Sequence, residues 1–162
     1  MNTRRATSGD ADALTALNAH VQNLHAEAVP ELFKPATSGV FYAPAPLEAL
    51  LTESHNHVFV VEIGSKPIGY LWAQLRERPE NVSTHAQYYL VIEHIAVSPD
   101  HQKQGAGAML INQVKSLAKE LGVTSVVLNV WSFNAKAHAF FASQGFADLD
   151  QRMSMRVDVL HD

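Results

Sequence analysis

Residues Ile92–Leu110 read IEHIAVSPDHQKQGAGAML, and this stretch decides the fold that we predict. It begins inside the run Tyr88–Val97, in which apolar residues occupy both alternating sets of positions, as is typical of a strand buried on both faces. Apolar residues then recur at helical spacing, at Leu110, Val114, Leu117, Ala118 and Leu121. We therefore predict a buried strand that leads through a short turn into a long helix.

Two glycines, Gly105 and Gly107, lie where this helix begins. Glycine lets the backbone turn tightly, and the first N–H groups of a helix lack an intrahelical acceptor and lie at the positive end of its dipole. The junction therefore predicts a phosphate or pyrophosphate site. It is not a dinucleotide fingerprint, because Leu110 replaces the third glycine, and it is not a P-loop, because no Gly-Lys-Ser/Thr follows. The alternative is that the glycines only permit a turn.

The amino-terminal part of the chain predicts a short strand and a long helix. We expect the strand around Arg4–Ala6 and a helix that Asp10 caps. Apolar residues recur in this helix at Leu14, Leu17, Val21 and Leu24. Four prolines, Pro30, Pro35, Pro44 and Pro46, make residues 28–46 an irregular loop. A short helix, Leu47–Ser54, is predicted after it, with Pro46 in its first turn.

Strands dominate the rest of the pattern. The segments His57–Ile63 and Ile68–Leu75 flank a turn-like tetrapeptide and predict an antiparallel hairpin, followed by a polar loop over Arg76–Gln87. Four elements are predicted after the junction helix: a buried strand Thr124–Val130, a helix Ala135–Ser143 and closing strands Phe146–Asp148 and Met153–Val159. Antiparallel strands followed by alternating strands and helices predict a mixed α/β (α+β) fold, and 162 residues predict a single domain over residues 1–162.

The composition excludes several classes of function. The chain has no cysteine, which excludes disulfides, thiolate metal sites and a cysteine nucleophile. Twelve Lys and Arg residues against 16 Asp and Glu residues give a net charge of −4, so we expect no nucleic-acid partner. No apolar stretch reaches the ~18–20 residues of a membrane helix, and residues 1–17 lack the apolar core of a signal peptide. We therefore expect a cytoplasmic protein without a membrane partner.

Two motifs resemble those of the GNAT superfamily, the acetyl-CoA-dependent N-acetyltransferases. Q-x-x-G-x-G beginning at Gln102, directly after E-x-I-A-V-x-P beginning at Glu93, resembles the acyl-CoA signature of this family. The second motif, N-x-x-A-x-x-F-Y-x-x-x-G-F, is matched at Asn134, Ala137, Phe140, Phe141, Gly145 and Phe146. The resemblance spans essentially the whole chain. It implies a mostly antiparallel central sheet that is splayed at the acyl-CoA site and flanked by helices.

The resemblance also implies a site for acetyl-CoA. Backbone groups of Ile95, Ala96 and Val97 would pair with the pantetheine arm as if it were an added strand. The pyrophosphate would lie on the loop residues Gln102, Lys103, Gln104, Gly105, Ala106, Gly107 and Ala108, with side-chain donors from Gln102 and Lys103. Asn134 would contact the cofactor, although plain helix capping is an equal alternative, and Phe141 would line the thioester end. Most members have a tyrosine at the Phe141 position, which often serves as the general acid.

Glu93 is the predicted general base. It is the only carboxylate in the apolar run, burial disfavours the charged form of a carboxylate, and many members of this family have a glutamate on this strand. The alternative is a structural pair with a histidine or an arginine. In a regular strand His94 points to the opposite face from Glu93, where we expect a hydrogen-bonded, partly buried histidine. His55 and His57 lack an evident third ligand, so we expect no metal.

The resemblance implies that the acceptor pocket includes residues His25–Tyr42 and Gln151–Arg156. The first range offers side chains to a small-molecule or peptide amine at His25, Glu27, Glu31, Phe33, Lys34 and Tyr42. We predict acetyl transfer from acetyl-CoA to a primary amine by direct attack in a ternary complex, because the chain has no cysteine and no G-x-S-x-G sequence for an acyl-enzyme. The alternative is a non-catalytic acyl-CoA-binding module that lost the acid at Phe141. Members of this family are often dimers, so a homodimer is one expected state.

Overall fold

The computed structural model describes residues 1–37, 39–41 and 47–157. Its contacts separate the chain into two compact units, Met1–Asn129 and Val130–Asp162, and each unit is described here by itself. The single domain expected over residues 1–162 stays a prediction. Tyr42, Pro44 and Pro46, for which the sequence predicts the proline-rich loop, lie outside the described residues.

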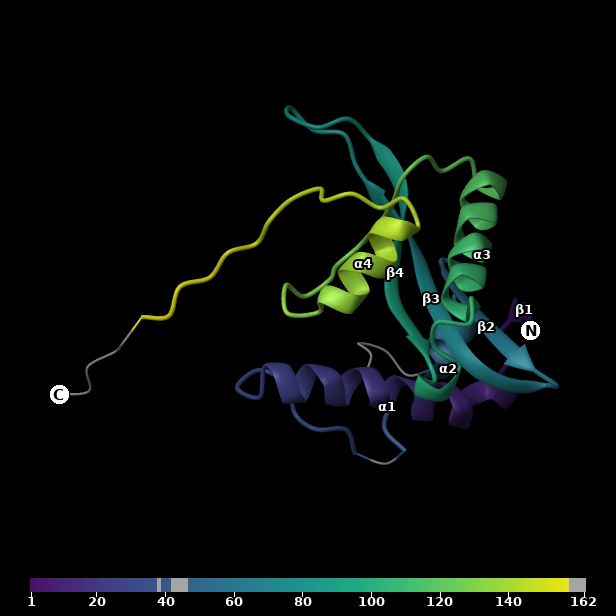
Figure 1. The fold of residues 1–162 in the computed structure, drawn as a ribbon. Helices are drawn as coiled ribbons and strands as arrows, with labels where there is room; N and C mark the ends of the chain where they lie inside the picture. Colours follow the sequence, from purple (N-terminus) through teal and green to yellow (C-terminus); the bar gives the residue numbers. More distant parts are fainter. Residues whose placement is uncertain (38, 42–46, 158–162) are drawn as a thin grey trace. The chain divides into compact units, whose positions relative to one another are not determined.

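One five-stranded sheet forms the centre of the first unit (Figure 1). In spatial order its strands are β1 (Asn2–Arg5), β2 (Asn56–Ile63), β3 (Lys66–Arg78), β4 (Gln87–Val97) and β5 (Val126–Leu128). Neighbours from β1 to β4 are antiparallel, whereas β5 runs parallel to β4. The mixed, mostly antiparallel sheet is therefore as predicted, although β5 is shorter than the expected strand Thr124–Val130.

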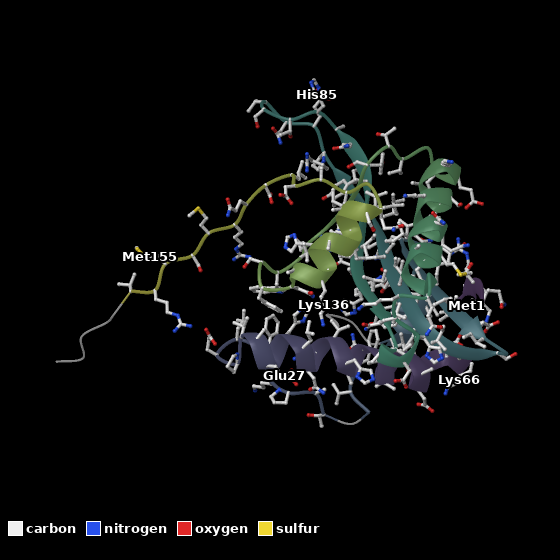
Figure 2. The ribbon with its side chains drawn as sticks, viewed as in Figure 1. Met1, Glu27, Lys66, His85, Lys136 and Met155 are labelled. Atoms are coloured by element: carbon white, nitrogen blue, oxygen red, sulfur yellow. The ribbon has the colours of Figure 1, made fainter. Side chains whose placement is uncertain are left out.

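The predicted hairpin is confirmed as β2 and β3. Gly64 and Ser65 connect the strands, with φ angles of 52° and 65°. Positive φ at both residues of a two-residue turn matches the twist of the strands. Strand β3 continues to Arg78 and β4 begins at Gln87, so four residues of the predicted polar loop belong to the sheet. In Figure 2, Lys66 marks the start of β3 and His85 lies in the loop beyond its far end.

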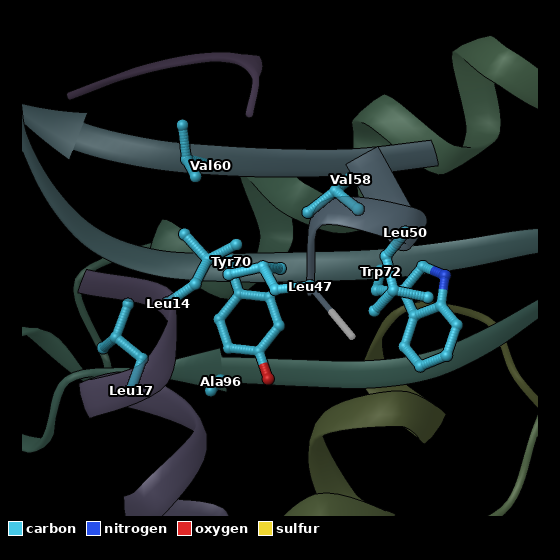
Figure 3. Packing of buried hydrophobic residues seen from close by; sticks show 9 residues of the cluster. All are labelled: Leu14, Leu17, Leu47, Leu50, Val58, Val60, Tyr70, Trp72 and Ala96. Atoms are coloured by element: carbon cyan, nitrogen blue, oxygen red, sulfur yellow. The ribbon is translucent and has the colours of Figure 1, made fainter. Parts of the chain in front are cut away.

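The helices α1 (Ala11–Ala28) and α2 (Leu47–Thr52) cover one face of the sheet. The hydrophobic cluster on this face consists of Leu14, Leu17, Leu47, Leu50, Val58, Val60, Tyr70, Trp72 and Ala96 (Figure 3). The first half of the predicted apolar stripe of α1 is confirmed by the burial of Leu14 and Leu17, whereas Val21 is partly buried and Leu24 is 44% exposed. Asn18 lies one turn from Leu14 on the same face and is 3% exposed, so its amide needs hydrogen-bond partners inside the protein.

The helix α3 (Ala106–Glu120) covers the opposite face. Its buried stripe includes Leu110, Val114 and Leu117, as the sequence predicts. Phe59, which alternates on β2 with the residues that face α1, lines a surface cavity together with Leu117 of α3. The predicted fold class, a sheet flanked by helices, is thus confirmed for this unit.

Arg4 forms ion pairs that connect the start of α1 to the sheet. Its guanidinium binds both carboxylate oxygens of Asp10 at 2.8 Å and Oε2 of Glu62, on β2, at 2.9 Å. Asp10 occupies the predicted N-cap position of α1, but its side chain does not bond to the helix. It accepts instead from the backbone N–H and the hydroxyl of Thr7. The Arg4 guanidinium holds the pKa of the Asp10 carboxyl at about 2, well below its usual value.

The second unit contains α4 (Ala135–Ser143), with the predicted bounds. The predicted closing strands are wrong for the residues that the structure describes, because residues 146–157 form no strand; Asp158 and Val159 lie outside those residues. Met153, Met155 and Val157 do alternate as in a strand, but they are 84%, 84% and 71% exposed. Alternation predicts a strand only if another strand supplies backbone partners. None of the described helices is long and apolar enough to span a membrane.

Candidate functional site

The pairing of β4 changes at Glu93. Toward β3, His94 pairs with Trp72, whereas Glu93 has no partner and forms a β-bulge. Toward β5, the pairing ends at Ile92. Residues Glu93–Val97, called the open edge below, therefore have a neighbouring strand on one side only within the described sheet. Backbone groups of such an edge can accept an extended ligand as an added strand.

The three predicted cofactor-binding residues of the strand lie in the open edge. Ile95, Ala96 and Val97 pair with β3 on their other side. Gly69 of β3 permits this close pairing, because a Cβ at Gly69 would lie 2.8 Å from the backbone oxygen of Ala96. The position of the open edge thus depends on a glycine in the neighbouring strand.

The loop Gln102–Ala108 connects the open edge with α3. Lys103 and Gly105 both have left-handed backbone conformations, with φ angles of 60° and 90°, and α3 begins directly afterwards at Ala106. Backbone that passes through such conformations at a helix start directs successive N–H groups toward one point, which favours an anion. The side chain of Gln102 donates to the backbone oxygen of Val97 at 3.2 Å, and so ties this loop to the end of β4.

The predicted side-chain donors of this loop are Gln102 and Lys103. Gln102 and Gln104 both donate to backbone oxygens of the preceding turn, Gln104 to Asp100 at 3.0 Å. Each amide keeps a second N–H, and Lys103 is exposed, so the predicted side-chain donors Gln102 and Lys103 both stay predictions.

Glu93 forms an ion pair with Arg76 of β3, with 2.5 Å between Oε1 and Nη2. The pair with an arginine is the structural alternative that the sequence left open. The side chains of Arg76 and Glu93 are 46% and 22% exposed, so the pair stabilises the fold by at most about 1 kcal/mol. A pair that weak can open when a ligand competes for the carboxylate.

The bulge changes the face on which Glu93 lies. Arg76 is four residues from Trp72 along β3 and therefore on the same face, which is the face covered by α1. Because Glu93 binds Arg76 and His94 pairs with Trp72, both side chains approach this face. The expectation that they point to opposite faces is wrong, because it assumed a regular strand.

His94 belongs to a polar cluster with Asn18 of α1 and Tyr70 of β3. Nδ1 of His94 lies 3.2 Å from the Tyr70 hydroxyl and 3.2 Å from Nδ2 of Asn18. The Asn18 amide also donates to the Tyr70 hydroxyl at 2.9 Å. Burial and, to a smaller extent, the nearby His25 lower the pKa of His94 to about 4, so the ring is neutral near pH 7. The expected hydrogen-bonded histidine is confirmed.

The end of α1 and the segment after it contain the predicted acceptor residues. The rings of His25 and Phe33 stack with centroids 5.0 Å apart, and burial lowers the pKa of His25. Glu27, Glu31 and Lys34 are exposed, and Tyr42 lies outside the described residues. Residues 151–156, the other predicted acceptor range, are exposed as well.

In the second unit, Asn134 caps α4. Its side-chain oxygen accepts from the backbone N–H of Ala137 at 3.1 Å, which is the structural alternative to a cofactor contact. Phe141 is buried, and its ring packs at 5.2 Å from Phe140 and at 5.6 Å, edge to face, from Phe146. The cofactor roles of Asn134 and Phe141 stay predictions.

The described histidines form no metal centre. His55 lies 3.4 Å from Glu53, and Nδ1 of His57 lies 3.2 Å from Arg5. Among the residues that the structure describes, no three His, Cys, Asp or Glu side chains are close enough to share a metal ion.

Sequence reasoning missed Arg76, Asn18 and Tyr70. Asn18 carried a usable signal, because a polar residue stands on the apolar stripe of α1 between Leu17 and Val21. Arg76 carried no such signal, because the sequence pattern predicts a loop at this residue and its pairing with Glu93 depends on the bulge in β4.

Comparison with known proteins identifies the family. The model of the Acetyltransferase (GNAT) family matches residues 19–146. The chain is 26% identical to N-acetyltransferase 8 of Homo sapiens over 104 residues, which cover 64% of this chain and 44% of that protein. It therefore spans less than half the length of the curated relatives that it matches.

Solved structures have the same fold. A tetramutant of the BH1408 protein from Bacillus halodurans has a TM-score of 0.90 at 21% identity, covering 97% of this chain and 100% of that chain. Aminoglycoside N-acetyltransferase AAC(6')-Iy in complex with CoA has a TM-score of 0.71 at 16% identity, covering 98% of this chain and 100% of that chain. At these identities the similarity concerns the fold alone. Since the family model matches most of its residues, the chain belongs to the GNAT family of acetyltransferases.

Proposed function

We propose that the protein transfers an acetyl group from acetyl-CoA to a primary amine of a small molecule or peptide, by direct attack in a ternary complex. The observation that carries this proposal is the open edge of β4 leading directly into the turn at the start of α3. One feature offers backbone groups to an extended amide chain, and the other offers N–H groups to a phosphate. Acetyl-CoA contains both an extended amide chain, its pantetheine arm, and a pyrophosphate.

The residues of the first unit fit this cosubstrate. Backbone groups of Ile95, Ala96 and Val97 pair with its pantetheine amides, and the first N–H groups of α3, at Ala106, Gly107 and Ala108, bind its pyrophosphate. The φ angle of 90° at Gly105 favours glycine, and apart from its chain neighbours no described atom lies within 4 Å of the position that a Cβ would take, so the turn has open space beside it. Acetyl-CoA supplies an activated thioester when bound. The family resemblance adds Asn134 and Phe141 as further contacts within the proposal.

Glu93 acts as the general base. Its carboxylate accepts a proton from the ammonium form of the acceptor, directly or through water, and leaves the amine lone pair free to attack. For this the Arg76–Glu93 pair must open, so that the acceptor replaces the Arg76 guanidinium at the carboxylate. The exposure of the pair to solvent permits this. Phe141 has no hydroxyl, so the departing thiolate is protonated by water or by another donor, consistent with a thiol pKa of about 8.5.

The proposal also covers partners and location. The acceptor is an amine, since the proteins that the chain resembles are named as N-acetyltransferases. A homodimer is supported by the exposed alternating side chains of Met153, Met155 and Val157. The proposal further includes a single functional domain over residues 1–162 and a cytoplasmic location.

The test measures acetyl-CoA binding and CoA release separately. Gly107→Glu adds bulk and negative charge where the pyrophosphate binds, and we expect it to abolish the acetyl-CoA-dependent rise in melting temperature. Ser116→Glu, which adds the same charge to an exposed position of α3 about 13 Å away, is the matched control and should keep it. A panel of amines is then screened with detection of free thiol.

The outcomes separate two functions. Binding together with amine-dependent CoA release supports the transferase. Binding without release for every amine favours the non-catalytic acyl-CoA-binding module, and equal acetyl-CoA affinity in Gly107→Glu and wild type refutes the assigned site.

A further inference from the structure

The polar cluster of Asn18, Tyr70 and His94 determines where the protons of its members lie. The Tyr70 hydroxyl accepts a hydrogen bond from Asn18, and its single proton then goes to an acceptor within reach, which is Nδ1 of His94. Burial raises the pKa of Tyr70, so the phenol keeps this proton. Figure 3 shows the Tyr70 ring among the residues of the cluster beneath α1 with its hydroxyl directed toward β4.

This arrangement selects one tautomer of His94. A ring nitrogen that accepts a hydrogen bond has no proton, so the proton of the neutral ring is on Nε2. Nε2 has no hydrogen-bond partner among the described residues, and it is not one of their fully buried polar atoms, so it is open to solvent. The missing acceptor is therefore water or a ligand.

The ring of His94 is also held in place. Trp72 meets it edge to face with centroids 5.2 Å apart, and the ring of Tyr70 does so at 6.4 Å. Phe41 packs against it at 6.0 Å, and Phe41 belongs to the segment after α1 in which the acceptor is expected. A donor with a fixed tautomer and a fixed orientation is suited to recognition, because little conformational freedom is lost on binding.

We propose that His94 donates a hydrogen bond from Nε2 to an oxygen atom of the acyl acceptor, and that Tyr70 and Asn18 are positioning residues for this donor. The inference rests on the proposed function and adds the substrate class. Glu93, brought to the same face by the bulge, accepts from the amine, while His94 recognises a hydroxyl, ether or carbonyl oxygen near it. A neutral N–H donor gives no such bond to a plain alkylamine, so amines with a neighbouring oxygen are preferred.

The tautomer is measured in the unmodified protein. Two-bond ¹H–¹⁵N correlation spectra of ¹⁵N-labelled protein distinguish a protonated from an unprotonated ring nitrogen. We expect His94 to show Nε2–H and a bare Nδ1 throughout pH 5.5–8. The charged groups near the ring are His25 on α1 and the Glu93–Arg76 pair, and Tyr70 stays neutral in this range. A proton on Nδ1, or a titration near pH 6.5, would overturn the inference.

Substrate selection is measured with amines that differ only by oxygen in place of CH₂, such as 2-methoxyethylamine and butylamine. In wild type we expect kcat/KM to favour the oxygen-containing amine by about tenfold, the value of one hydrogen bond. His94→Leu should remove this preference through KM for the amine, with acetyl-CoA affinity unchanged, and His94→Gln, which keeps a donor near Nε2, should restore part of it.

Two results count against the inference in different ways. If the wild-type protein shows no preference for the oxygen-containing amine, or if this preference persists in His94→Leu, the inference is overturned while the proposed function stands. Absence of acetyl transfer to every amine overturns the proposed function and the substrate assignment together, even where the spectra show the expected tautomer. Tyr70→Phe gives a further check, since loss of the hydroxyl removes a donor to Nδ1 and should let the ring populate Nδ1–H in the same spectra, whereas an unchanged tautomer would exclude Tyr70 as a positioning residue.

Discussion

Replacing Arg4 should cost the fold far more than replacing its neighbour Arg5. Arg4→Met keeps most of the side-chain volume but leaves the carboxylates of Asp10 and Glu62, which are 5% and 7% exposed, without their cation. The pKa of Asp10 falls from 3.8 to about 2 in the folded protein. At about 1.36 kcal/mol per pKa unit this lowering corresponds to about 2.5 kcal/mol, which is an upper bound for the loss at Asp10, because the hydrogen bonds from Thr7 cause part of it and remain in Arg4→Met.

The pH dependence gives the sign of the effect. Because the folded-state pKa of Asp10 is lowered, its contribution to stability is fully present above the unfolded value of 3.8 and is lost as pH falls through about 2. The stability difference between wild type and Arg4→Met should therefore be constant above pH 5 and shrink between pH 4 and pH 2. At neutral pH it should lower the melting temperature by about 5–10 °C.

The assay is urea unfolding of wild type, Arg4→Met and Arg5→Met at several pH values. Arg5 is the matched control, because it is exposed on the same strand, lies over the Phe59 ring and has no carboxylate partner within the described residues. We expect Arg5→Met to lose less than about 1 kcal/mol. Equal losses in the two variants, or a loss in Arg4→Met that does not change down to pH 2, would refute the reasoning.

Three further predictions concern the site and the second unit. Glu93→Gln should lower kcat by about 10²–10⁴-fold with acetyl-CoA affinity unchanged, and wild-type turnover across pH 6–9 would leave Glu93 with only its pair to Arg76. Gly69→Ala should destabilise the fold by about 1–3 kcal/mol and weaken acetyl-CoA binding, since its Cβ would lie 2.8 Å from the Ala96 oxygen in the open edge; unchanged binding by calorimetry contradicts this. Phe141→Ala should cost about 3–5 kcal/mol in urea unfolding because the ring is buried against Phe140 and Phe146, and a loss below 1 kcal/mol would be inconsistent with that packing.

Much of the first unit follows from local patterns. The hairpin of β2 and β3 was predictable because apolar strands flank a glycine-containing turn, and α3 because its apolar stripe starts after a glycine-rich junction. The closing strands were not predictable in the same way. Met153, Met155 and Val157 carry the right alternation, but a strand exists only where another backbone pairs with it, and the sequence does not encode that partner locally.

The candidate site was predicted in its backbone parts and not in its side-chain pairs. The turn at Gly105 depends on a residue type that permits a left-handed backbone, so the sequence shows it directly, whereas the strand residues Ile95, Ala96 and Val97 were expected from the family resemblance. Arg76 and Asn18 depend on which segments the fold brings together. Position 93 shows the difference well: the glutamate was identified, while its arginine partner, left open as one alternative, came from a segment predicted to be a loop.

The β-bulge explains why alternation failed at the most important position of the chain. In β4 both faces are buried, so apolar residues fill both alternating sets and nothing in the pattern reveals an inserted residue. Yet the insertion does two things at once. It interrupts the pairing with β3 at the residue after the last one paired with β5, and it turns Glu93 toward the face that holds His94. Deleting one residue here would restore a regular strand and would move the side chains of Glu93 and His94 to opposite faces, so the proposed pairing of a proton acceptor with a proton donor depends on the bulge.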